Sequence, residues 1–107
     1  MINVKKEEKT IELGQTDVEE QINKVFNLER RGDTYLLMLV KELKRIMDDR
    51  GVSINELARR SGISVATVSR TVSFKTHPAF EVLYEMFAAM NVELTITITE
   101  HKELGDE

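Results

Sequence analysis

The side chains best suited to a chemical role lie between residues 59 and 75, where hydroxyl, small apolar and guanidinium groups are interspersed. Arg70 could donate two parallel hydrogen bonds to a guanine, a pairing that discriminates between bases by about 1–3 kcal/mol. Val65 and Ala66 could contact thymine methyl groups from the preceding helical turn, and Ser69 shares their exposed side. The residues predicted to read base edges in a DNA major groove are Val65, Ala66, Ser69 and Arg70.

A second group of polar residues fits the sugar–phosphate backbone of DNA. Hydroxyl and cationic side chains commonly donate to phosphate oxygens, and such contacts fix the register of a protein on the duplex rather than the sequence it reads. The predicted phosphate contacts are Ser64, Thr67, Arg59, Arg60 and Lys75. Arg70 could instead be a solvated residue or the partner of an acid, but the small residues beside it favour base readout.

The distribution of charge is more informative than its sum. The chain of 107 residues has a formal net charge of -4, which by itself argues against a nucleic-acid partner. Between residues 41 and 75, however, eight Lys or Arg stand against four Asp or Glu, which gives +4 there and -8 for the rest of the chain. A basic central segment can be attracted to phosphate if the acidic ends fold away from it.

Two short helices at a fixed angle are needed to present these residues to a groove. Ser53 and Ser64 are suitable N-caps and predict helices over 54–60 and 65–72, while Gly62 fits the turn between them. This pattern predicts a helix-turn-helix whose second helix enters the major groove. The residues of the motif predicted to face the core are Leu57, Ala58, Ile63 and Val68.

Three further helices are predicted around this motif. Apolar spacing and a capping-box pattern at Thr16 indicate a helix over 17–29, and residues 32–34 are expected to interrupt it. The clearest helix is expected over 34–50, and another over 78–90. The Met and aromatic residues of this last helix could form a groove for a protein partner, but at this spacing such residues more often belong to the core. Phe87 is assigned to the core, and three residues are left open: Tyr84, Met86 and Met90.

Residues 92–98 change the apolar period from that of a helix to that of a strand. Their apolar members alternate with polar ones and are Val92, Leu94, Ile96 and Ile98. A lone amphipathic strand leaves its edges unpaired, which favours pairing with a second chain. Such a homodimer would place two recognition helices roughly 34–36 Å apart on a palindromic operator. Pairing with Ile2–Val4 or Ile11–Leu13 of the same chain is the alternative.

Two stretches resemble known families of DNA-binding proteins. Residues 54–72 read INELARRSGISVATVSRTV and look very like the helix-turn-helix of lac-repressor-type proteins. In those proteins the residues matching Val65, Ala66 and Arg70 are the principal base readers. The order of helices across residues 34–100 is similar to the phage-repressor (XRE) fold. Residues 80–96 also resemble HipB-type antitoxins, whose last helix runs into a strand that pairs across a dimer.

Other classes of function receive little support from the sequence. The chain has no cysteine, and His77 and His101 have no companion ligands, so neither thiol chemistry nor a metal site is expected. No cofactor is expected either, and an enzyme is least favoured, because no carboxylate pair, activated nucleophile or phosphate loop is present. No apolar segment approaches the roughly 18 residues of a membrane span, and no signal peptide is evident, so a cytoplasmic location is the default expectation.

These observations predict a mainly α protein: a five-helix XRE-like helix-turn-helix domain with a C-terminal β-strand. The expected organisation is an N-terminal arm and helix (1–33), the DNA-binding domain with its dimerisation strand (34–100) and an acidic tail (101–107). The expected function is sequence-specific binding of double-stranded DNA by a dimeric repressor that reads an inverted repeat. One alternative is an antitoxin that binds a cognate toxin and represses its own promoter. Another is a protein-interaction module with a vestigial helix-turn-helix.

Overall fold

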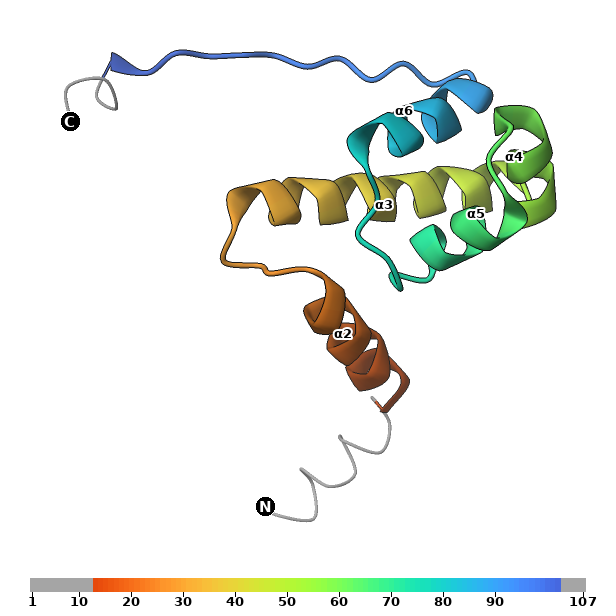
Figure 1. The fold of residues 1–107 in the computed structure, drawn as a ribbon, viewed down its shortest axis with the longest axis horizontal. Helices are drawn as coiled ribbons and strands as arrows, with labels where there is room; N and C mark the ends of the chain where they lie inside the picture. The colour runs from red at the N-terminus through yellow and green to blue at the C-terminus, as the bar shows by residue number, and fades with distance from the viewer. Residues whose placement is uncertain (1–12, 103–107) are drawn as a thin grey trace.

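The computed structural model describes residues 13–102, with side chains described from residue 17 onward. This part of the chain forms five α-helices and no strand. Figure 1 shows how they are arranged. None of these helices combines the length and the apolar character required to cross a membrane. The helices are α2 (Leu13–Val25), α3 (Arg31–Arg50), α4 (Ile54–Ser61), α5 (Val65–Val72) and α6 (Phe80–Ala89).

The longest helix, α3, is the axis on which the other elements pack. Helices α5 and α6 contact α3 directly, and α4 contacts both α5 and α6 (Figure 1). Apolar residues at helical spacing on α3 bury one stripe against these helices, as the periodicity predicts. The most completely buried side chains from the four helices are Val40, Leu43, Leu57, Val68, Leu83, Met86 and Phe87.

The first break between helices lies earlier than the sequence predicts. We expected a helix over 17–29 and an interruption at 32–34, but α2 ends at Val25 and α3 begins at Arg31. Asp33 lies in the first turn of α3, where a carboxylate is favoured by the helix dipole, and accepts a hydrogen bond from the backbone N–H of Asn27 at 2.7 Å. The chain therefore turns at Asn27 and not at Gly32.

The start of α2 also differs from the prediction. Thr16 was expected to cap a helix beginning at residue 17, but it lies within α2. The burial of α2 follows its spacing in part, because Ile22 and Phe26 enter the core while Val18 stays largely exposed. These apolar residues are spaced four positions apart, which places them on one side of the helix. The N-terminal helix thus shares the core of the other four.

The predicted C-terminal strand is not found among the described residues. Residues 92–100 leave α6 as an extended tail without secondary structure (Figure 1). Val92 and Leu94 are half-buried against the core, but Ile96 is 66% exposed and Ile98 is 91% exposed. A strand needs a neighbouring backbone to form its ladder. Within the described part of the chain no such neighbour is present: of the alternative partners, Leu13 is the first residue of α2, and Ile11 and Ile2–Val4 lie outside that part.

Helix α6 is shorter than expected. It was predicted over 78–90, but it begins at Phe80, after the buried Pro78. The assignment of Phe87 to the core is confirmed, and Met86 and Met90 are core residues as well. Tyr84 is exposed. Of the three residues left open, the two methionines thus belong to the core and Tyr84 does not.

Candidate nucleic-acid interface

The helix-turn-helix predicted from the sequence is formed by α4 and α5. Ser53 Oγ accepts a hydrogen bond from the backbone N–H of Glu56 at 3.0 Å, and Ser64 Oγ accepts one from that of Thr67 at 3.1 Å. Both serines are therefore the N-caps that the sequence indicates. Between the helices, Gly62 has a φ of +77°, which glycine adopts without steric strain. These local bonds fix where α5 begins relative to α4.

One face of α5 is buried and the opposite face is open. Val68, Thr71 and Val72 are buried in the core. On the other side, Val65 is 48% exposed, Ala66 and Arg70 are exposed and Ser69 is half-buried. Positions four apart lie above one another on a helix, so residue 65 aligns with 69 and residue 66 with 70. The four residues predicted to read bases thus lie on one side of a single eight-residue helix.

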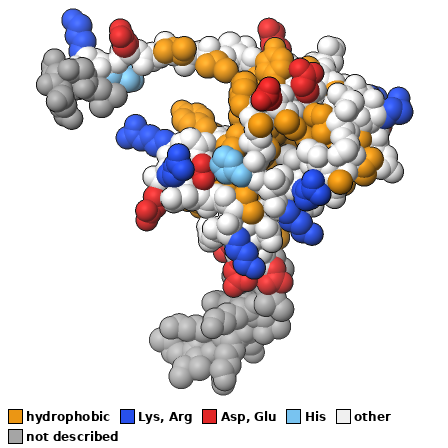
Figure 2. Space-filling view, in the orientation of Figure 1, with side chains coloured by type: hydrophobic (Ala, Val, Ile, Leu, Met, Phe, Trp, Pro, Cys, Tyr) orange, Lys and Arg blue, Asp and Glu red, His pale blue; other side chains and the backbone are white. Residues whose placement is uncertain are grey.

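Some of the residues predicted to contact phosphate already have a partner within the protein, and others do not. The Ser64 hydroxyl caps α5 and donates to Thr67 Oγ1 at 2.9 Å, so its proton is used within the motif. Arg60 forms an ion pair with Glu56 one turn earlier. Arg59 and Lys75 are exposed and form no ion pair with any residue from 17 to 102. Figure 2 shows Lys and Arg side chains over the end of α5 and on α2.

Two basic residues of α3, Lys44 and Arg45, are paired with acids on the same helix. Arg45 hydrogen-bonds Glu42 at 3.1 Å and Asp49 at 2.7 Å, and Lys44 lies 3.7 Å from Asp48. The hydrogen bonds from Arg45 lower the pKa of Glu42, and in return the pKa of Arg45 is raised. Of the net +4 of residues 41–75, +3 is therefore carried by residues 51–75, the helix-turn-helix and the loop after it.

The end of α5 depends on residues that the sequence did not reveal. Phe74 N–H donates to Thr71 O at 3.1 Å and Lys75 N–H donates to Arg70 O at 2.8 Å, which closes the helix. Gln21 Nε2, from α2, donates to Phe74 O at 3.1 Å. Gln21 and Phe74 are 53 positions apart, so no local pattern could have predicted this contact.

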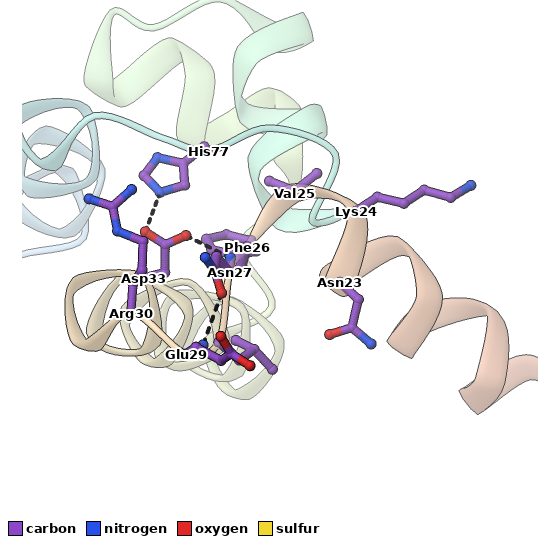
Figure 3. A pocket seen from close by; sticks show the side chains of 10 residues that line it. Asn23, Lys24, Val25, Phe26, Asn27, Glu29, Arg30, Asp33 and His77 are labelled. Carbon is purple, nitrogen blue, oxygen red and sulfur yellow. Dashed lines mark hydrogen bonds and ion pairs between the residues drawn. The ribbon is translucent and has the colours of Figure 1, made fainter.

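A second contact joins the same loop to α3. His77 Nε2 lies 3.0 Å from Asp33 Oδ1, and the His77 ring packs on Phe26 with their centroids 5.4 Å apart (Figure 3). The hydrogen bond from His77, followed by that from the Asn27 backbone, lowers the pKa of Asp33. His77 lies in the loop after α5 and ties this loop to Asp33. An open polar cleft beside it is also lined by Asn23, Lys24 and Arg30.

Two further sequence predictions concern metals and dimerisation. In residues 13–102, no three potential metal ligands of the His, Asp and Glu types gather at one place. The four residues predicted for a dimer strand all lie in the extended tail. Apolar side chains of this tail border a groove together with α3 and α6. The groove is lined in part by Tyr35, Met38, Phe80, Leu94 and Ile96.

Comparison with known proteins identifies the family of this motif. The family described as the Cro/C1-type HTH DNA-binding domain matches residues 42–95. The match runs from the middle of α3 to the tail and so contains the whole of α4 and α5. No curated protein and no solved structure matches the chain. The XRE-like character expected from the sequence is confirmed: the chain belongs to the Cro/C1-type helix-turn-helix family of DNA-binding domains.

Proposed function

We propose that the protein regulates transcription by binding a specific sequence of double-stranded DNA, with α5 in the major groove. The observation that carries the proposal is the open face of α5. Val65 and Ala66 leave apolar surface for thymine methyl groups, while Arg70 is exposed and forms no ion pair within the described residues. Arg70 reads guanine and Ser69 lies beside it.

The phosphate contacts follow from the positions of the basic residues around α5. Arg59 precedes the recognition helix and Lys75 follows it, so each neutralises backbone charge at one end. Thr67 is half-buried near the start of α5 and donates to a nearby phosphate, and the cap residue Ser64 presents the first turn. Arg60 contributes after leaving its ion pair with Glu56.

We further propose a homodimer that represses by occupying an inverted repeat. The support is the tail, where the large apolar side chains of Ile96 and Ile98 are exposed next to the apolar groove on α3. A second tail laid against the first would complete the ladder that one chain lacks, through Val92, Leu94, Ile96 and Ile98. Sedimentation of a chain truncated after Asn91 should show monomers; a dimer of unchanged affinity would contradict tail pairing.

The test of base readout is a gel shift on the DNA upstream of the protein's own gene. Wild type is expected to bind this DNA more tightly than random sequence, and Arg70→Ala should lose roughly tenfold or more of that preference. Equal binding of wild type and Arg70→Ala, no tighter than to random DNA, would contradict readout by α5.

An antitoxin is the second candidate, supported by the acidic exposed side of α2. Asp17, Glu19 and Glu20 are all exposed and offer a surface to a basic protein partner, such as a cognate toxin. A toxin gene adjacent to this gene, whose product co-purifies with the chain, would favour it. A protein-interaction module with a vestigial helix-turn-helix predicts instead that no DNA is bound in a salt-sensitive manner.

A further inference from the structure

Phe74 adopts a backbone conformation that its residue type disfavours. Its φ is +61°, in the left-handed region where the Cβ of an L residue crowds its own backbone. Among the described residues, Asn91 is the one other non-glycine with positive φ, at +62°, and asparagine tolerates this region better. A bulky residue remains there only where its surroundings hold it in place.

Three helices of the described part end in the same way, which allows a direct comparison. In each, the residue after the cap takes a left-handed conformation and two N–H groups donate back into the last turn; this is the Schellman motif. Gly51 fills the left-handed position at the end of α3, and Asn91 fills it at the end of α6. Only α5, the recognition helix, ends on an aromatic residue.

The groups that hold Phe74 come from α2. Gln21 Nε2 donates to the Phe74 carbonyl at 3.1 Å, which fixes the peptide on the strained side of the residue. Phe74 is only 9% exposed and belongs to the buried core, as do Ile22 and Phe26. Gln21 of α2 thus supplies a polar contact to the residue that caps α5.

The loop is held again three residues further on. His77 packs on Phe26, at the end of α2, and hydrogen-bonds Asp33 at 3.0 Å (Figure 3). Asp33 is only 8% exposed and also accepts from the Asn27 N–H. The segment between Phe74 and His77 is therefore held at one end by Gln21 of α2 and at the other by Phe26, just after α2, and by Asp33 in the first turn of α3.

The hydrogen bonds that cap α5 include the backbone of Arg70, the residue assigned to base readout. The N–H of Lys75 donates to the carbonyl of Arg70 at 2.8 Å, so Arg70 is itself a member of the cap. If Phe74 left the left-handed region, this bond would break and the last turn of α5 would loosen. Arg70 would then lose the fixed backbone that directs its side chain.

We propose that α2 braces the recognition helix: it holds the strained cap at Phe74, and displacement of α2 weakens operator binding. This inference rests on the proposed function. The close helix-to-helix contacts of the described residues are confined to α3, α4, α5 and α6, so α2 is attached mainly by the side chains named above. Its acidic side remains exposed while it is docked, so a partner can reach it. Gln21 and His77 act as positioning residues.

The test uses Gln21→Met, which keeps the length and helix propensity of the side chain and removes the donor to Phe74. Amide hydrogen exchange without DNA should show faster exchange at Phe74 and Lys75, with little change in α4 and α6. Affinity for the operator should fall by roughly threefold to tenfold, the worth of one hydrogen bond. Affinity for random DNA, which depends on phosphate contacts, should be nearly unchanged. Asn23→Met, on an exposed position of the same helix, is the matched control and should behave as wild type.

Other outcomes are distinguishable. Unchanged exchange at the cap together with wild-type operator affinity would overturn the brace. An equal loss on operator and random DNA with a lowered melting temperature would also overturn it, because α2 would then serve only the fold. If Gln21→Met does not fold, His77→Ala must give the same local exchange pattern. If wild type itself does not distinguish the operator, the proposed function fails, while the exchange measurement still supports or overturns the brace.

Discussion

Helices α3 and α5 treat their exposed side chains in opposite ways. On α3, Arg45 bonds Glu42 and Asp49, and Lys44 pairs with Asp48, all along the same helix. On α5 the exposed surface consists of small side chains and Arg70, which has no ion pair with any described residue. A surface whose charges are already satisfied suits a scaffold, whereas an unmatched cation beside apolar groups suits an external anion or base. The difference agrees with the proposed function, in which α3 holds the fold and α5 meets the DNA.

The largest expected effect is a loss of folding stability when the buried face of α3 is disrupted. Leu43 on α3 is completely buried, so Leu43→Ala should lower the free energy of unfolding by about 2–5 kcal/mol. Val65→Ala on the open face of α5 should change it by no more than about 0.5 kcal/mol, while weakening operator binding. Urea unfolding followed by circular dichroism measures both. Equal destabilisation by the two variants would contradict the division of roles.

A smaller effect tests whether the charges of α3 are as inert as their pairing indicates. Arg45→Ala removes a cation that is already bonded to two acids, so affinity for operator DNA should stay within about twofold of wild type. The melting temperature should also change little, because exposed ion pairs contribute weakly. Fluorescence anisotropy against the operator provides the measurement. A loss comparable with that of Arg70→Ala would show that α3 contacts DNA as well.

The smallest effect concerns the acid stability of the loop after α5. The native pKa of Asp33 lies below its ordinary value, chiefly because of its hydrogen bond with His77. This contribution to stability is therefore present above the pKa of the unfolded chain and is lost as the pH falls through the native pKa. Asp33→Asn should flatten the fall in stability below about pH 4, as followed by thermal melts from pH 6 to pH 2. An unchanged acid limb would show that Asp33 titrates alike in both states.

Local patterns account for the elements that were predicted well. The starts of α4 and α5 follow from Ser53 and Ser64, whose hydroxyls bond amides three residues away. The burial of Leu57, Ala58 and Val68 follows from the same short motif. For this reason the candidate recognition surface could be identified from the sequence, although its contacts with DNA remain predictions.

The remaining features depend on contacts between distant parts of the chain. The turn at Asn27 requires Asp33, whose other oxygen is held by His77, 44 positions away. The cap at Phe74 requires Gln21. The predicted strand is not found in the described residues because a strand is defined by its neighbour, and an alternating pattern cannot supply one. Periodicity therefore predicted which face of each element is apolar, but not the elements against which that face packs.

Selection of preferred sites from a pool of random duplexes tests the central claim most directly. Wild type should enrich an inverted repeat with a guanine in each half-site, and Arg70→Ala should enrich the same repeat with the preference at that guanine lost. Enrichment of identical sites by both proteins, or of no site by the wild type, would contradict base readout by α5.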